Sequence, residues 1–252
     1  MRISGNTIFI PGATSGIGLA LAMALRDKGN TVIVGGRRQH LLDQIAADHD
    51  LATIAIDTAD PASISAAARQ VSAEHPNLNV LVTMAGIMRV EDWTRSGFAE
   101  GAAEIVTTNL LGPIRLIDAF LDQLLAQPDA TIMTVSSGLA FAPLKVTPTY
   151  NATKAAIHLL SESIRLQLAG TSVDVVELEP PAVQTDLMPG QRESAFAMPL
   201  DAFVGEVMGL IEAQPDATEI QVERVKFLRY GEARGDYDQV VATLNQADPH
   251  GK

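Results

Sequence analysis

The sequence predicts an α/β fold, a doubly wound parallel sheet with helices on both faces. Short apolar runs alternate with longer amphipathic stretches through the first two-thirds of the chain. The short runs are rich in Val, Ile and Thr, a composition typical of strands that are buried on both faces. The links between the two kinds of segment are short, which favours parallel strands connected through helices.

The predicted elements follow one another in a regular order. The apolar runs predicted as strands are Thr7–Ile10, Thr31–Val34, Ala52–Ile56, Val80–Thr83, Thr131–Val135 and Val173–Leu178. The amphipathic stretches predicted as helices include Ile17–Lys28, Ala62–Glu74, Phe98–Ala126 and Tyr150–Leu168. Asp60 and Pro61 indicate a helix start, with Asp as the N-cap and Pro at the first helical position. Gly29 is typical of a helix end.

The segment 180–200 interrupts this order. It contains four prolines between Pro180 and Pro199 and few periodic apolar positions. We therefore expect a mobile loop over a binding site. The chain contains no repeat, low-complexity segment or linker, so residues 1–252 are predicted to form a single domain.

Composition and charge exclude several classes of function. The chain is 47% hydrophobic and 19% charged, and its lack of cysteine excludes disulfides and thiolate metal sites. A net charge of −12 disfavours nucleic acid and anionic membranes as partners. No apolar run reaches the roughly 18 residues of a membrane span. The first residues do not resemble a secretory leader, so we expect a cytoplasmic protein.

No metal site is expected from the sequence. The five histidines show no paired ligand spacing; they are His40, His49, His75, His158 and His250. A lone histidine on a helix, such as His158, is typical of a surface or core residue.

A glycine-rich turn joins the first predicted strand to the first predicted helix. Gly12, Gly16 and Gly18 stand in the spacing G-x-x-x-G-x-G. Glycines there allow close approach of a pyrophosphate, and the helix N-terminus supplies free N–H groups and partial positive charge. A purely structural turn would also use glycines, but the place of this turn at the carboxyl end of a parallel strand favours dinucleotide binding.

The end of the second strand favours NADP over NAD. An acidic residue there would bind the ribose hydroxyls of NAD, but this chain has Gly36 followed by Arg37 and Arg38. Two guanidinium groups can hold a 2′-phosphate. The alternative is a solvated basic start to the next helix.

A tyrosine and a lysine indicate acid/base chemistry. Tyr150 and Lys154 are four residues apart and share one face of a predicted helix. A phenol titrates near 10, and we expect the Lys154 ammonium and a cationic nicotinamide to lower the pKa of Tyr150. Ser137 ends the fifth strand, and Asn109 lies inside a predicted helix. Each of these residues alone has ordinary explanations, such as a cap, a kink or an exposed pair.

Together with Ala85-Gly86 after the fourth strand, these motifs resemble the short-chain dehydrogenase/reductase family over about residues 5 to 190. The resemblance implies a Rossmann-like sheet of about seven strands. Within the family, the run Pro180–Leu187 resembles a subgroup of uncharacterised oxidoreductases labelled as similar to a protein of teichoic-acid D-alanylation operons. The resemblance does not assign the D-alanylation pathway to this chain, because function depends on the residues of a site and not on a label.

The resemblance also implies residue roles. Ser137 would hydrogen-bond the substrate oxygen, and Tyr150 would donate or accept its proton. Lys154 would bind the nicotinamide ribose and lower the pKa of Tyr150, while Asn109 would hold a water that links Lys154 to solvent. The residues expected to contact NADP(H) are Gly12, Ser15, Gly16, Ile17, Gly18, Arg37, Arg38, Asp57, Ala85, Gly86, Tyr150, Lys154, Pro180, Val183 and Thr185. Asp57 among them would contact the adenine.

The chain departs from the family pattern at several positions. Pro11 replaces a Thr, Thr83-Met84 replaces a pair of Asn, and Pro181 replaces a Gly. In the family, that Thr and one Asn help to tie adjacent turns together; because both are missing here, neither is left without its partner. We expect that packing holds the turns together instead. The glycine-rich C-terminal segment of the family is absent, which favours a homodimer through the helices near 105–126 and 150–168 over a homotetramer.

The expected substrate is a hydrophobic ketone, aldehyde or secondary alcohol. The residues predicted near the nicotinamide are mostly apolar, namely Ile87, Met88, Leu139, Phe141, Val183, Leu187 and Met188, with Trp93 in the loop after the fourth strand. Some of them are expected to be core residues. Two alternatives remain open at this point: a dehydratase or epimerase with a tightly held cofactor, and a non-catalytic NADP(H)-binding regulatory protein.

Overall fold

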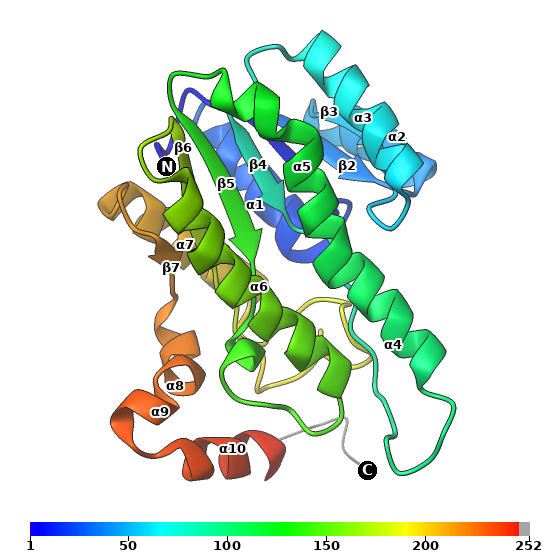
Figure 1. Ribbon diagram of the computed structural model, residues 1–252, viewed down its shortest axis with the longest axis vertical. Coiled ribbons are helices and arrows are strands. Elements are labelled where there is room, and N and C mark those ends of the chain that lie inside the picture. The colour runs from blue at the N-terminus through cyan, green and yellow to red at the C-terminus, as the bar shows by residue number, and fades with distance from the viewer. Residues whose placement is uncertain (247–252) are drawn as a thin grey trace.

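The computed structural model describes residues 1–246, and its strands form one seven-stranded sheet (Figure 1). The strands are β1 (Thr7–Pro11), β2 (Thr31–Gly36), β3 (Ala52–Ala55), β4 (Val80–Thr83), β5 (Ala130–Val135), β6 (Val173–Leu178) and β7 (Glu219–Ile220). Their spatial order is β3-β2-β1-β4-β5-β6-β7, and every neighbouring pair is parallel. The predicted Rossmann-like fold is therefore confirmed.

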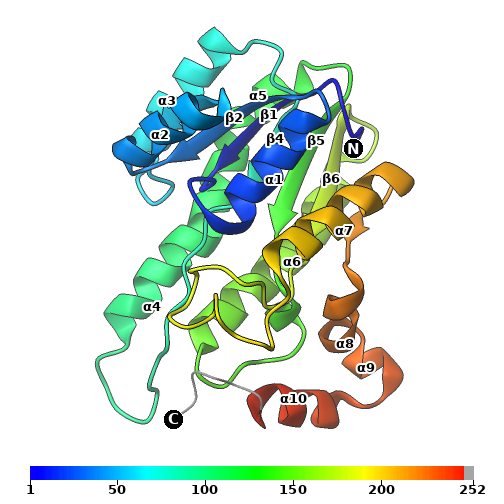
Figure 2. The ribbon, with the colours of Figure 1, turned by 180° about the vertical axis from the view of Figure 1, so that it is seen from behind.

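Helices cover both faces of the sheet, as Figures 1 and 2 show from opposite sides. The helices are α1 (Gly16–Asp27), α2 (Gln39–His49), α3 (Pro61–Glu74), α4 (Ala99–Val106), η1 (Thr107–Leu111), α5 (Gly112–Leu125), η2 (Gly138–Ala140), α6 (Pro148–Leu168), α7 (Leu200–Ala213), η3 (Glu223–Val225), α8 (Lys226–Arg229), α9 (Gly231–Arg234) and α10 (Tyr237–Gln246). Side chains alternate between the two faces of a strand. Ile8 and Ile10 join the core beneath α1, α2 and α7, whereas Phe9 joins the core beneath α3 and α5.

The predicted elements are present, with ends shifted by at most two residues. The stretch Phe98–Ala126 is one unbroken helical run, but residues Thr107–Leu111 form a π-helical turn within it. Asp60 caps α3 as predicted, because its side chain accepts a hydrogen bond from the backbone N–H of Ala62. The segment Glu179–Pro199 contains no helix or strand, in agreement with the predicted loop.

The order of the strands reverses next to β1, which predicts where a ligand would bind. Here the sheet edge means the side of the sheet that is formed by the carboxyl ends of its strands. The chain runs outward from β1 to β2 and β3, then returns to β4 on the other side of β1. In open parallel sheets, ligands bind at the carboxyl ends of the strands where the order reverses. The segments that follow β1, β2, β4 and β5 all meet at this edge.

No helix within residues 1–246 is long and apolar enough to cross a membrane.

Candidate active site

The turn between β1 and α1 provides a tightly packed cradle. Gly12 has a positive φ of 89°, and a Cβ atom on it would lie 2.5 Å from the Cα of Ala85. A Cβ on Gly18 would lie 2.8 Å from the Cα of Ala13 and 3.0 Å from Met84. Glycine is therefore required at both positions. Helix α1 starts at Gly16 without a side-chain cap, so its first N–H groups face the hollow beside the turn.

Two neighbouring hollows extend from this turn along the sheet edge. The larger, of about 370 Å³, is lined by the turn, the catalytic candidates Ser137, Tyr150 and Lys154, and the loop after β6. The smaller, of about 290 Å³, is lined by Arg37, Arg38 and Asp57 as well as residues of the turn. Because the hollows share Gly12 and Ser15, they form one continuous surface.

All the residues predicted to contact the cofactor line one of these hollows. Arg38 donates a hydrogen bond to the Thr14 hydroxyl at 2.9 Å, and Arg37 lies 3.7 Å from a carboxylate oxygen of Asp57. The two guanidinium groups therefore stand beside the turn, while both residues are also solvent-exposed at the start of α2, where Arg38 is the N-cap.

Tyr150 and Lys154 lie on α6 and are both buried. Lys154 Nζ lies 5.6 Å from the centre of the Tyr150 ring and donates a hydrogen bond to the carbonyl oxygen of Val135 at 2.7 Å. Burial raises the pKa of Tyr150 to about 12, against a smaller lowering by the Ser137 hydroxyl. Burial also lowers the pKa of Lys154 to about 8, against the opposing charge of Glu177. With the protein's own groups alone, burial holds the pKa of Tyr150 above its usual value, and its expected lowering by Lys154 together with a cationic nicotinamide stays a prediction.

Ser137 and Asn109 complete the predicted set. Ser137 follows β5, lines the larger hollow with Tyr150, and accepts a hydrogen bond from the N–H of Leu139. Asn109 is buried in the π-helical turn, where its amide donates to the carbonyl oxygen of Ile87 and its side-chain oxygen accepts from the N–H of Ile87, both at 2.8 Å. The side chain of Asn109 therefore fixes the loop after β4. The alternative of a surface Asn at a kink is wrong.

The departures from the family pattern have mixed consequences. Ala85 packs against Gly12 and Met84 against Gly18, which agrees with turns held by packing. The buried hydroxyls of Thr83 and Ser136 have no hydrogen-bond partner within the described residues. Pro181 lines the hollow, and the carbonyl of Pro180 before it accepts a hydrogen bond from the N–H of Gly138 at 2.9 Å.

Sequence reasoning missed Glu91, which supports the first turn of α6. One carboxylate oxygen of Glu91 accepts from the Thr149 N–H and the other from the Thr149 hydroxyl, both at 2.7 Å. The N–H of Glu91 also donates to the carbonyl of Val146 at 2.9 Å. Glu91 thereby holds the residue next to Tyr150. A carboxylate near a helix N-terminus is a known stabilising contact. The sequence did not reveal this one because Glu91 and Thr149 are 58 residues apart.

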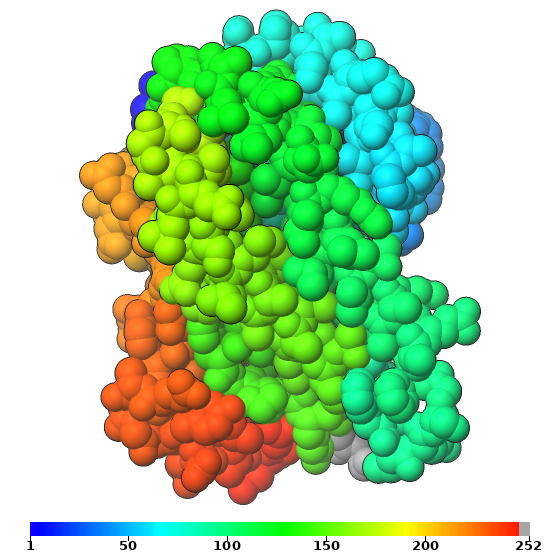
Figure 3. Space-filling model, in the orientation of Figure 1, coloured from blue at the N-terminus to red at the C-terminus, as the bar shows by residue number. Residues whose placement is uncertain are grey.

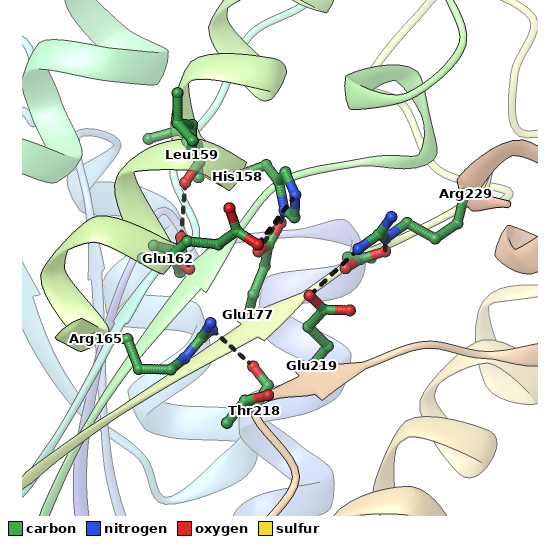
Figure 4. Close-up of polar contacts among 12 residues, drawn as sticks. His158, Leu159, Glu162, Arg165, Glu177, Thr218, Glu219 and Arg229 are labelled. Carbon is green, nitrogen blue, oxygen red and sulfur yellow. Dashed lines mark hydrogen bonds and ion pairs between the residues drawn. The ribbon is translucent and has the colours of Figure 1, made fainter. Parts of the chain in front are cut away.

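The structure also gives His158 neighbours that its spacing in sequence did not reveal. Ligand atoms of His158, Glu177, Glu179 and Glu219 all lie within 4.8 Å of one another. Figure 4 shows the Arg229 side chain reaching this group from the C-terminal segment. The Arg229 guanidinium lies 3.5 Å from Glu179 and 3.4 Å from Glu219, so a side-chain cation stands beside two of the three carboxyl groups.

Comparisons with known proteins agree with this architecture. The family model for short chain dehydrogenases matches residues 6–195. An uncharacterised oxidoreductase of Bacillus subtilis (strain 168), DltE, is 37% identical over 97% of this chain and 98% of its own length. A 2,3-dihydro-2,3-dihydroxybenzoate dehydrogenase of Escherichia coli (strain K12) is 31% identical over 74% of this chain and 73% of its own.

Among solved structures, a short chain dehydrogenase from Burkholderia cenocepacia J2315 in complex with NADP superposes with a TM-score of 0.82. It covers 97% of this chain and 99% of its own, at 23% identity, which supports the fold. With the family model covering more than half of the sequence, the chain belongs to the short-chain dehydrogenase family of oxidoreductases.

Proposed function

We propose that this protein is an NADP(H)-dependent oxidoreductase that acts on a hydrophobic ketone, aldehyde or secondary alcohol, with Tyr150 as its general acid/base. The observation that carries the proposal is the continuous surface from Arg37 and Arg38 to Tyr150. It joins a phosphate-sized basic end to a buried phenol and hydroxyl at the other end.

The chain's own residues fit the cofactor. The glycine positions leave space where a Cβ would clash, and the start of α1 offers free N–H groups for the pyrophosphate. Arg37 and Arg38 would hold a 2′-phosphate, with Arg38 already oriented by Thr14. Asp57, at the same end, would contact the adenine. When bound, the cofactor supplies or accepts a hydride.

The catalytic residues act on the proton of the substrate oxygen. At neutral pH the phenol of Tyr150 is protonated, since its pKa is raised to about 12 by burial. It is therefore set to donate its proton to a carbonyl oxygen that gains charge during reduction. Ser137 would orient that oxygen through a hydrogen bond, and the Lys154 ammonium would stabilise the phenolate that remains. Asn109 would link Lys154 to solvent through a water, as the family pattern implies.

We also propose a homodimer formed through α5 and α6. Four leucines and an isoleucine on η1, α5 and α6 are exposed, namely Leu111, Ile114, Leu125, Leu159 and Leu166. Figure 3 shows the two helical segments together on the front surface of the molecule. Leu166 is 80% exposed, which favours a partner that would bury it.

Titration of the purified protein with NADPH and NADH, followed by nicotinamide fluorescence, tests the proposal. We expect NADPH to bind at least about tenfold more tightly than NADH, because only NADPH carries the 2′-phosphate that the arginines would bind. An Arg37→Ala/Arg38→Ala variant should lose that preference but still bind NADH. Equal binding of both cofactors by the wild type would overturn the NADP assignment. Tight binding with no turnover of any carbonyl or alcohol would favour a regulatory protein.

A further inference from the structure

An apolar cavity adjoins Tyr150 on the side away from the glycine turn. Its volume is about 170 Å³, and Ser137 and Tyr150 form its polar end. The C-terminal segment Glu223–Gln246 forms part of its wall through Leu228 of α8 and Leu244 of α10. Among residues 1–246, no charged residue lines the cavity; the remaining lining residues are Met88, Gly138, Leu139, Leu144, Pro181, Ala182, Leu187, Gln191, Ser194, Phe196 and Ala197.

The C-terminal segment packs directly against the catalytic loop between Ser137 and Tyr150. A Cβ on Gly138 would lie 2.8 Å from Leu228 Cδ1 and 3.0 Å from Val225 Cγ2, so the two segments are closely packed at this glycine. At the other end of the segment, Asn245 donates to the carbonyl of Pro143 at 3.0 Å and accepts from the N–H of Lys145 at 2.7 Å. Figures 1 and 2 show α8, α9 and α10 gathered at the end of the molecule that carries this loop.

A buried charge cluster anchors α8. Glu177 of β6 and Glu179, the residue directly after β6, are fully buried, and Glu219 on β7 pairs with Glu177 in the sheet register. A buried carboxylate without a partner is strongly destabilising. His158 lies 2.9 Å from Glu177, whereas Arg229 supplies the cation beside Glu179 and Glu219.

Arg229 also connects this cluster to the catalytic loop. Its guanidinium carbon lies over the Phe141 ring, 4.2 Å from the ring centre. The Phe141 ring also contacts the His158 ring edge-on, with 4.7 Å between the two ring centres. Undocking of α8 would therefore leave buried carboxylates without their cation and expose an aromatic ring. The adjacent Leu228 is held in the cavity wall by the same anchor.

We propose that the segment Glu223–Gln246 is the specificity-determining wall of the substrate site, with Leu228 and Leu244 receiving an uncharged, apolar substituent of the carbonyl substrate and Arg229 as its anchor. The family model ends at residue 195, so this wall is a feature of the chain outside the matched region. The inference rests on the proposed function, which places the reacting oxygen of the substrate at Ser137 and Tyr150. It adds the size and polarity of the rest of the substrate.

The experiment compares a series of methyl ketones, from 2-butanone to 2-octanone, with NADPH. In the wild type, kcat/KM should rise with chain length as the substituent fills the cavity. Leu244→Phe, which fills the cavity, should lower kcat/KM for 2-octanone about tenfold or more and change that for 2-butanone about twofold or less. Leu228→Ala, which enlarges the cavity, should shift the preference to longer ketones. Phe227→Ala is the matched control, because Phe227 is on the same helix, is exposed and does not line the cavity.

The anchor is tested with two further variants. Arg229→Met keeps much of the apolar stem but removes the charge, and it should reduce the discrimination between long and short ketones. Adding Glu179→Gln, which removes the acidic group that Arg229 faces, should restore the discrimination. Equal changes in kcat/KM for all ketones in Leu244→Phe and Leu228→Ala would overturn the role of the segment as a specificity-determining wall. Failure of Glu179→Gln to restore the discrimination would overturn the role of Arg229 as the anchor.

Calorimetric titration with 2-octanone separates this inference from the proposed function, because binding does not require turnover. If no ketone oxidises NADPH but Leu244→Phe still weakens binding of 2-octanone about tenfold relative to Phe227→Ala, the wall stands and the proposed reaction fails. If ketones are reduced but binding and length preference are the same in all variants, the proposed reaction stands and the wall is wrong.

Discussion

Tyr150 and Lys154 differ in how burial affects their protonation. Burial disfavours the charged form of each group, so it raises the pKa of the phenol to about 12 and lowers that of the ammonium to about 8. Near neutral pH the phenol is protonated and the lysine is mostly cationic. This is the arrangement in which Tyr150 can give a proton to a substrate oxygen and Lys154 can stabilise the phenolate left behind.

Replacement of Tyr150 by Phe removes the proton donor and little else. We expect Tyr150→Phe to lower kcat by about 10²- to 10⁴-fold, the usual contribution of a general acid. The dissociation constant for NADPH should change much less, because the glycine turn and the two arginines are untouched. Steady-state kinetics and fluorescence titration measure the two quantities. Wild-type turnover in Tyr150→Phe would refute the assigned role.

At the scale of elements, the position of Tyr150 depends on how α6 begins. The helix starts at Pro148, and Thr147 before it makes no side-chain cap. Instead Glu91, from the loop after β4, accepts hydrogen bonds from the N–H and hydroxyl of Thr149. A carboxylate at a helix N-terminus also interacts favourably with the helix dipole. The loop after β4 therefore holds the helix that carries the catalytic pair.

Loss of this cap should affect both stability and catalysis. Glu91→Ala is expected to cost about 1 kcal/mol of unfolding free energy, or roughly 2–4 °C in Tm for a chain of this size, and to lower kcat several-fold. Glu91→Gln should restore part of both effects, because it keeps hydrogen-bond acceptors.

The neighbouring carboxylate provides the matched control for this variant. Asp92 bonds only Thr94 and Arg95 within its own loop, so Asp92→Ala should leave kcat nearly unchanged. Equal losses of kcat in Asp92→Ala and Glu91→Ala would show that the loop, rather than the cap on α6, is responsible. Thermal unfolding and steady-state kinetics provide the two readouts.

At the scale of the whole molecule, Glu179 and His158 should make stability depend on pH. Burial raises the pKa of Glu179 to about 8, and the charges of Glu177 and Glu219 act in the same direction. The hydrogen bond with Glu177 raises the pKa of His158. Both groups therefore bind protons more tightly in the folded protein than in the unfolded chain.

Stability should accordingly fall as the pH rises from about 5 to about 8. An unfolded Glu titrates near 4.3, so across this range the folded state retains a proton on Glu179 that the unfolded chain has released. The contribution of His158 is complete below about 6.5 and is lost as the pH rises through its higher folded value. We expect a loss on the order of a few kcal/mol. Tm measured at steps of half a pH unit tests this.

Variants assign the effect to the cluster. Glu179→Gln should flatten the decrease in Tm between pH 5 and 8, because the glutamine has no proton to release. The other resolved shifts act elsewhere, since Asp92 titrates near 2, Lys154 near 8 and above, and Tyr150 near 12. A Tm that rises steadily between pH 5 and 8 in the wild type would contradict the assignment.

Local patterns in the sequence were enough to predict the strands and the main helices, and the resemblance to a family added the candidate site residues. Periodicity, glycine turns and helix caps depend on neighbouring residues, and parallel strands bring their carboxyl ends to one edge. The prediction therefore placed Gly12, Arg38, Ser137 and Tyr150 on one surface correctly.

Only the tertiary structure decided the long-range contacts. Glu91 is 58 residues from the Thr149 that it caps, and the carboxylates beside His158 come from two strands and meet an arginine from α8. In sequence, Glu177 and Glu179 at the end of β6 are indistinguishable from the exposed positions of a half-buried strand. In the structure α6 packs against β6, and Arg229 of α8 lies beside Glu179. Leu228 and Leu244 of the C-terminal segment line a cavity together with Tyr150. Such neighbours depend on the order of the strands and on the path of the C-terminal segment, which no local pattern in the sequence encodes.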